Sequence, residues 1–169
     1  MEFRDLIRKR YSVRAYKPDA VEPEKLDRVL EAAILAPTAA NRQPFRVIVI
    51  RTAGRQEELR RIYKNEWFVQ APLVIGICGV PTEAWTRRDG KNYCDVDVTI
   101  AMDHLILAAA NEGLGTCWIG AFDAQAAREV LELPAGVEPI AFTPLGYAAD
   151  APREKKRKSR AELVKFDRW

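Results

Sequence analysis

The chain has 169 residues, of which 48% are hydrophobic and 30% are charged, and its formal net charge is +3. This length suits one domain with an ordinary core, and the composition lies far from that of disordered chains. The net charge is too small to favour nucleic acid as a partner of the whole surface. No apolar run approaches the ~20 residues of a membrane span, and the first residues lack the apolar core of a signal peptide. We therefore expect a cytoplasmic protein with neither a membrane nor a nucleic-acid partner.

The cysteines and the histidine predict neither a metal site nor a disulfide framework. Cys78, Cys94 and Cys117 are odd in number and form no C-x-x-C pair, and His104 is the only histidine. A zinc site needs closely spaced cysteine or histidine ligands, and a disulfide framework usually has an even number of cysteines. The chain has neither.

Hydrophobic spacing in the first half of the chain predicts helices and strands in mixed order. One short helix should end near Arg10, and a second should begin at Pro23 and run until Pro37. The β-branched run 45–50 predicts a strand, which a charged helix over 55–63 follows. The unbroken apolar run 73–78 predicts a central strand that is covered on both faces.

The second half begins with a segment, 95–111, that is apolar almost all round and is closed by Gly113. Because it contains Asp97, Asp103 and His104, we expect it to be a helix buried in a core or against a second subunit. A strand over 117–122, a helix from an Asp123 cap to 131, and a final strand ending at 144–147 should follow. The order predicts one α+β domain, residues 1–169, with a basic arm at 150–169.

Two segments in the first third carry groups suited to ligand binding. In Arg10-Tyr11-Ser12-Val13-Arg14, two guanidinium groups flank a hydroxyl, which suits a phosphate, although an isolated pattern of this kind is more often a solvated turn. In the segment 36–45, small residues surround Asn41 and Gln43 and would let a flat ligand approach. Proline and asparagine are also common in ordinary loops, so the sequence favours neither a ligand-binding loop nor a purely structural one for this segment.

Two further segments lie in the second half. The glycines of 113–120 close a helix and open a strand, which is the reverse of a Rossmann fingerprint and excludes that kind of nucleotide site. Pro144-Leu145-Gly146-Tyr147 precedes the basic run 155–158. On charge alone that run would be a solvated arm or one that binds nucleic acid.

Together, in this order and spacing, the four segments resemble the nitroreductase family of flavoproteins over nearly the whole chain. The resemblance is most specific in Arg10-x-Ser12-x-Arg14 and in Ala36-Pro37-Thr38 through Asn41-x-Gln43-Pro44-Phe45. The glycine segment 113–120, the segment 144–147 and the Lys155-x-Arg157 tail complete the pattern. It implies an α+β fold with an antiparallel-rich central sheet flanked by helices. It also implies an intertwined homodimer with FMN held between the two subunits.

The resemblance also implies residue roles. Arg10, Lys155 and Arg157 would hold the FMN phosphate, while Ser12 and Arg14 would lie nearer the pyrimidine edge and the ribityl chain. From the opposite subunit, the isoalloxazine ring would be contacted by Pro37, Thr38, Ala39 and Asn41. The backbone N–H of Gly120 would donate to N5. The full implied set is Arg10, Tyr11, Ser12, Arg14, Pro37, Thr38, Ala39, Asn41, Gln43, Ile119, Gly120, Lys155 and Arg157.

The implied activity is transfer of electrons from NADH or NADPH to nitroaromatics, quinones or similar electron-poor acceptors by a ping-pong mechanism. Because the flavin itself carries this chemistry, no catalytic side chain is expected. The alternatives are a flavin-binding dimer without turnover, or a specialised member that removes halogen reductively or fragments flavin. Salt dependence separates a cofactor phosphate site from a nucleic-acid arm.

The segment between Tyr63 and Asp95 is shorter than the helical excursion that shapes the substrate pocket of larger members, so no acceptor preference is implied. Asn65 is a candidate for an amide near the flavin pyrimidine. The aromatic residues in and near this segment are assigned no role, because single aromatics are more often core residues or surface caps. They are Trp67, Phe68, Trp85 and Tyr93.

Overall fold

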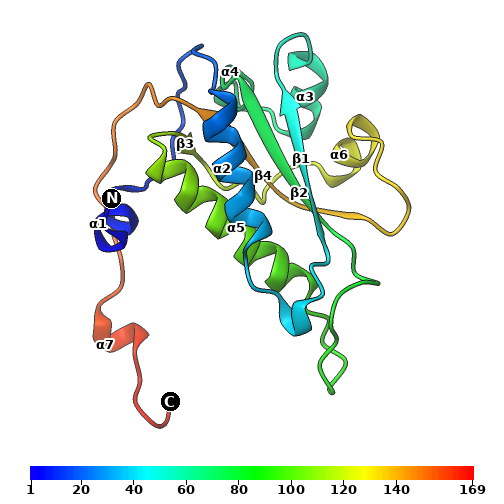
Figure 1. Cartoon of the computed structure of the whole chain (residues 1–169), viewed down its shortest axis with the longest axis vertical. Coiled ribbons are helices and arrows are strands. Elements are labelled where there is room, and N and C mark those ends of the chain that lie inside the picture. The colour runs from blue at the N-terminus through cyan, green and yellow to red at the C-terminus, as the bar shows by residue number, and fades with distance from the viewer.

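The computed structural model describes residues 1–169 and shows a four-stranded sheet with helices on both faces (Figure 1). Every strand pairing is antiparallel, and the strand order is β1-β2-β4-β3. The prediction of an α+β fold with an antiparallel-rich sheet is confirmed. The strands are β1 (Phe45–Arg51), β2 (Leu73–Gly79), β3 (Gly115–Thr116) and β4 (Glu138–Gly146).

The helices divide between the two faces of the sheet. On one face, α5 (Cys94–Asn111) packs on the sheet, and α2 (Pro23–Ile34) and α1 (Phe3–Lys9) pack on α5. The other face is covered by α3 (Gln56–Ile62), α4 (Trp67–Gln70) and α6 (Ala124–Val130). A short 3-10 helix, η1 (Ala39–Asn41), and a last helix, α7 (Arg160–Leu163), complete the chain.

Strand β2 lies in the middle of the sheet between β1 and β4, and its residues from Val74 to Gly79 are buried. Its side chains alternate between two cores, because successive residues of a strand point to opposite faces. Ile75 and Ile77 join the core beneath α2 and α5, and Val74 joins the core beneath α3, α4 and α6. The unbroken apolar run 73–78 therefore predicted a doubly covered central strand correctly.

Helix α5 is the longest helix, and its buried residues follow a three-to-four-residue spacing that forms one continuous face toward the sheet and α2. On the opposite face Val96, Thr99 and Asp103 are exposed, so the chain alone does not bury the helix all round as its composition predicted. It ends where Gly113 adopts a φ of +77°, a left-handed conformation that suits glycine. There the N–H of Leu114 donates back to the carbonyl of Ala109 at 2.8 Å. Neither α5 nor any other helix is both long and apolar enough to cross a lipid bilayer.

The strand expected over 117–122 is wrong, because β3 ends at Thr116. The register that pairs Thr116 with Leu145 would next pair Cys117 with Pro144, which has no N–H to donate. The N–H of Cys117 donates instead to Oγ1 of Thr143 at 2.9 Å. Pairing resumes only in a single bridge between Ile119 and Phe142, so the segment is a loop rather than a strand.

The basic arm, 150–169, leaves the end of β4 and runs past α1 before it extends away from the body (Figure 1). Most of its residues are exposed. Its one regular element is α7, where the hydroxyl of Ser159 and the carboxylate of Glu162 form a capping box.

Candidate functional site

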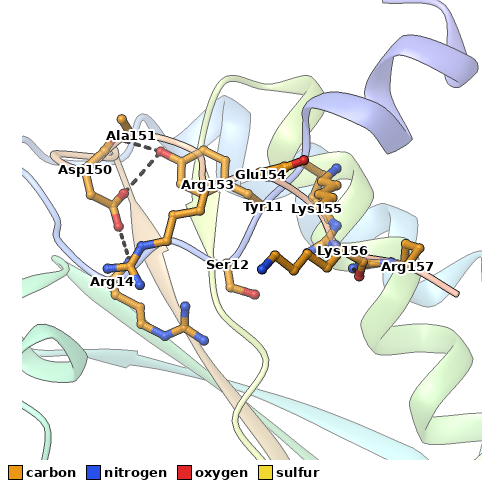
Figure 2. Close-up of a pocket in the computed structure, with 11 residues that line it drawn as sticks. Tyr11, Ser12, Arg14, Asp150, Ala151, Arg153, Glu154, Lys155, Lys156 and Arg157 are labelled. Atoms are coloured by element: carbon orange, nitrogen blue, oxygen red, sulfur yellow. Dashed lines mark hydrogen bonds between the residues drawn. The ribbon is translucent and has the colours of Figure 1, made fainter.

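The two basic ends of the chain meet at a cavity of about 270 Å³ (Figure 2). One wall is the extended segment 10–14, which follows α1, and the other is the beginning of the arm. Of the residues expected to bind a cofactor, six line this cavity together. They are Arg10, Tyr11, Ser12, Arg14, Lys155 and Arg157.

The segment 11–14 is held against β3 by backbone pairing. Ser12 forms a parallel bridge with Thr116, and the N–H of Val13 donates to the Thr116 carbonyl at 2.9 Å. The Val13 side chain is buried, so its neighbours Ser12 and Arg14 point to the opposite side, toward the cavity. Gly115 permits this approach, because a Cβ there would lie 2.7 Å from a Val13 methyl group.

Asp150 ties the arm to the same segment. Its carboxylate accepts hydrogen bonds from the Arg14 backbone N–H at 2.8 Å and from the Tyr11 hydroxyl at 3.1 Å (Figure 2). The Tyr11 hydroxyl also donates to the Asp150 carbonyl at 2.9 Å. Burial and the neighbouring Asp150 carboxylate both raise the pKa of Tyr11, which keeps this hydroxyl a donor.

Lys155 closes the other end of the cavity. Its Nζ donates to the carbonyl of Ile7 at 2.9 Å and to that of Arg8, both in the last turn of α1. These carbonyls have no partner inside the helix, so a cation there satisfies them and complements the helix dipole. The pKa of Lys155 is lowered by partial burial and then by the positive charges of Arg10 and Arg157.

The cavity carries a concentrated and unpaired positive charge. Arginines elsewhere pair with carboxylates, as Arg28 does with Glu112 at 2.7 Å. No cation of the cavity forms such a pair, although Asp150 and Glu154 also line it. The six cations are Arg10, Arg14, Arg153, Lys155, Lys156 and Arg157.

The second group of predicted residues lies at the other end of α5 (Figure 1). The loop 37–43 contacts the first turn of α5, where the Ala39 N–H donates to Oδ1 of Asp97 at 2.8 Å. The cavity instead adjoins the region that follows the last turn. Since α5 has 18 residues, its ends are separated by about 27 Å at 1.5 Å per residue. A single chain therefore does not bring Pro37, Thr38, Ala39, Asn41 and Gln43 to the cavity.

Within that loop, the hydrogen bonds are local. The Gln43 N–H donates to Oγ1 of Thr38 at 3.0 Å, and the Gln43 amide donates to the carbonyl and Oδ1 of Asn41, both at 3.0 Å. Asn41 and Gln43 are exposed. The amide side chains of Asn41 and Gln43, which could hydrogen-bond to the edge of a flat ligand, thus hold each other in place at the surface.

The third predicted group, Ile119 and Gly120, lies in the loop after β3. The Ile119 side chain is buried in the core beneath α3 and α6, and its backbone pairs with Phe142. Gly120 is exposed, and its N–H donates no hydrogen bond within the chain. This N–H is therefore available to a ligand.

Two residues that hold the cavity and the loop 37–43 in place were not identified as site residues from the sequence. Asp150 acts through Tyr11, which is 139 residues away, and Asp97 acts through the loop before β1. Asn65 is exposed, and its carbonyl accepts from the Phe68 N–H at 2.9 Å in the turn that opens α4. Nothing in these contacts distinguishes Asn65 from an ordinary loop residue.

The four aromatic residues without an assigned role have packing partners. Trp67 and Phe68 meet the ring of Tyr63 edge-on, with ring centroids 5.4 and 5.5 Å apart. Trp85 and Tyr93 form a similar pair at 5.0 Å in the excursion between β2 and α5. These contacts fit the interpretation of these residues as core and surface-packing groups.

Known proteins share this architecture. A crystal structure of a nitroreductase family protein from Clostridium difficile 630 is 38% identical to the chain and superimposes on it with a TM-score of 0.90, covering 100% of each. An FMN reductase (NAD(P)H) of Bacillus subtilis strain 168 is 28% identical over 163 aligned positions, which are 86% of this chain and 66% of the relative. An NADH dehydrogenase of Thermus thermophilus is 28% identical over 84% of each protein.

The sequence pattern of a whole family also fits the chain. The model of the nitroreductase family matches residues 7–72 and 53–147, which include the segment 10–14, the loop 37–43 and the loop after β3. The arm lies outside this match, so its role rests on the geometry of the cavity. The chain belongs to the nitroreductase family.

Proposed function

We propose that the protein is an FMN-dependent oxidoreductase that works as a homodimer and passes electrons from NADH or NADPH to an electron-poor acceptor such as a nitroaromatic or a quinone. The observation that carries this proposal is the cavity where the two basic ends of the chain meet without any ion pair. Bound FMN would supply the chemistry, accepting hydride from the nicotinamide and passing electrons to the second substrate in a ping-pong sequence.

The donor set of the cavity fits a phosphate group. Arginine offers forked donors to phosphate oxygens, lysine offers a point charge, and the Ser12 hydroxyl adds a hydrogen bond. Partial burial lowers the pKa of Lys155, and repulsion by Arg10 and Arg157 lowers it further. A dianion between them would relieve that repulsion. We assign the phosphate to Arg10, Lys155 and Arg157, with Tyr11 holding the arm in place.

Residues farther along the segment would act on the flavin ring. Arg14 is exposed and has no carboxylate partner, so its charge is free to stabilise the negative charge of the reduced cofactor near N1 and O2. The free N–H of Gly120, held in place by the bridge at Ile119, is our choice for the donor to N5. In these roles the chain binds and orients the cofactor, and no side chain acts as a nucleophile.

A second subunit would complete the site. The loop 37–43 lies about one α5 length from the cavity of its own chain, which is longer than one FMN molecule. We therefore assign Pro37, Thr38, Ala39, Asn41 and Gln43 to the flavin of the partner.

Exposed apolar surface also supports a dimer. Phe3 and Leu35, which are 64% and 72% exposed, line a groove of about 450 Å³ over α1, α2 and α5. Leu163, Phe166 and Trp169 of the arm are exposed as well. Patches of this kind on a small protein mark interaction surfaces. We place the arm of one subunit on this groove of the other, which makes the dimer intertwined.

The visible absorption spectrum of the purified protein tests the proposed function. It should be recorded after addition of FMN and removal of the excess, and then after anaerobic addition of NADH and of NADPH. We expect protein-bound flavin bands that bleach, and the faster donor is the preferred one. Bands that persist with both donors would indicate a flavin-binding protein without turnover. Absence of bound flavin would contradict the proposal.

A further inference from the structure

The loop that precedes β1 adopts a costly backbone conformation. Ala40, Asn41 and Gln43 have φ values of 51°, 55° and 50°, in the left-handed region that residues with a Cβ seldom occupy. Such residues persist only where the surroundings hold them, and they gather at ligand sites. Three of them within four positions need contacts that keep the loop in this shape.

One of those contacts comes from a buried carboxylate. Asp97 is 1% exposed, and its Oδ1 accepts the Ala39 N–H at 2.8 Å. Its Oδ2 is buried and has no hydrogen-bond partner. Burying a carboxylate with an unpaired oxygen is unfavourable, although the first turn of α5 supplies a positive helix dipole. An apolar residue would fill this position of the core without that cost, so the carboxylate has a task beyond packing.

We propose that Asp97 is a positioning residue that fixes the loop 38–43 through the Ala39 N–H, and so shapes the surface that one subunit presents to the flavin of the other. The inference rests on the proposed function. Asp97 would not touch the flavin itself and would act by holding the backbone at Ala39, next to the first left-handed residue. Thr38 supports the same turn by accepting the Gln43 N–H at 3.0 Å.

Removing the carboxylate should loosen the loop and weaken cofactor binding in a folded protein. In D97A we expect the FMN dissociation constant to rise about tenfold or more, because binding must then restore a loop conformation that is no longer held. In D97N the amide oxygen still accepts the Ala39 N–H, so affinity should stay within about threefold of wild type. Fluorescence titration of the apoproteins with FMN measures both values.

A second readout separates positioning from a general loss of stability. Hydrogen–deuterium exchange of the apoproteins should show faster exchange of the peptide covering 37–44 in D97A than in wild type. The peptides of β2 and β4 should be unchanged. D95A is the matched control, since Asp95 is an exposed carboxylate in the same helical turn and makes no side-chain hydrogen bond. It should behave like wild type in both measurements.

The outcomes are distinct. If D97A binds FMN as wild type does, or if D97N binds as weakly as D97A while both are folded, the inference is wrong. Should D97A not fold, D97L replaces it, because leucine has nearly the same shape and lacks both oxygens. Wild-type protein that binds no FMN contradicts the proposed function. Wild-type protein that binds FMN with the same affinity as D97A and D97L contradicts only the role of Asp97.

Discussion

Arg10 stands at the end of α1, where its backbone N–H still donates to the Leu6 carbonyl at 2.9 Å while its side chain reaches the cavity. We predict that Arg10→Ala weakens FMN binding about 10- to 150-fold, because one charge-assisted hydrogen-bonded partner of a phosphate contributes roughly 1.5–3 kcal/mol. Equilibrium titration of the apoprotein measures the change. Arg51→Ala is a suitable control, since Arg51 is exposed and unpaired at the end of β1. Arg10→Ala protein that keeps its full flavin at low concentration would refute this assignment.

Glu22 gives a pH-dependent prediction. Its carboxylate accepts the Tyr147 hydroxyl at 2.6 Å and pairs with Lys25 at 3.2 Å. These contacts, the Tyr147 hydrogen bond first, lower the pKa of Glu22 from 4.5 to about 2. A lowered folded-state pKa contributes stability that is present above pH 4.5 and is lost as the pH falls toward 2.

The comparison of wild type with Glu22→Gln tests the direction of this pH dependence of stability. Urea unfolding should show wild type to be the more stable of the two at pH 7, with a small difference because Glu22 is exposed. That difference should shrink steadily below pH 4.5. A difference that stays constant down to pH 2.5 would mean that the Glu22 carboxylate does not titrate with the fold.

Among the residues that line the cavity, the sequence predicted those whose partners lie nearby in the chain or that belong to a specific motif. Arg10, Ser12 and Arg14 are spaced by two, and an extended segment places Ser12 and Arg14 opposite the buried Val13. Asp150 was missed, because its role depends on Tyr11, a contact across 139 residues that no local spacing encodes.

Among the elements, the pairing of segment 11–14 with β3 decides the shape of the cavity. Gly115→Ala would place a Cβ 2.7 Å from Val13 Cγ2, so the segment must move away from β3. We predict a loss of about 1–3 kcal/mol in unfolding free energy from this overpacking, together with weaker FMN binding.

The double variant Gly115→Ala, Val13→Ala provides the matched control. Removing the two methyl groups of Val13 relieves the contacts at 2.7 and 3.1 Å and leaves only the Val13 Cβ, at 3.1 Å, so the two changes should be non-additive. The double variant should recover FMN affinity relative to Gly115→Ala alone. Strict additivity of the two single effects would show that the segment is held by something other than this contact.

Most elements followed from periodicity, while the strand expected over 117–122 did not form. Its apolar residues, which include the β-branched Ile119, satisfy local strand preference, yet the partner strand places Pro144 opposite Cys117. Strand formation depends on what a neighbouring strand can donate, and that neighbour lies far along the chain. The short helix α4 was also missed, because four residues of helix carry too little periodicity to be recognised.

For the whole molecule, the proposed dimer makes cofactor binding depend on association. Leu35 is 72% exposed at the end of α2 and lines the apolar groove. Leu35→Asp should leave the folded monomer intact and shift size-exclusion elution toward monomer mass, with FMN binding lost in parallel, since each flavin needs residues of both chains. Gln70→Asp adds the same charge at an exposed position of α4 on the other face of the sheet and should change neither property. A Leu35→Asp monomer that binds FMN normally would overturn the shared site.

The cavity joins residues at the two ends of the polypeptide, and this fixes when it can exist during synthesis. Tyr11 leaves the ribosome long before Asp150, 139 residues later, gives it a partner. Until the arm has been synthesised, the cavity lacks the wall that carries Lys155 and Arg157. If the cavity holds the FMN phosphate as proposed, we expect FMN to load only after the arm has been synthesised, and a chain stalled before Arg153 should bind no FMN. On this proposal, bound flavin would report that translation has passed through the arm.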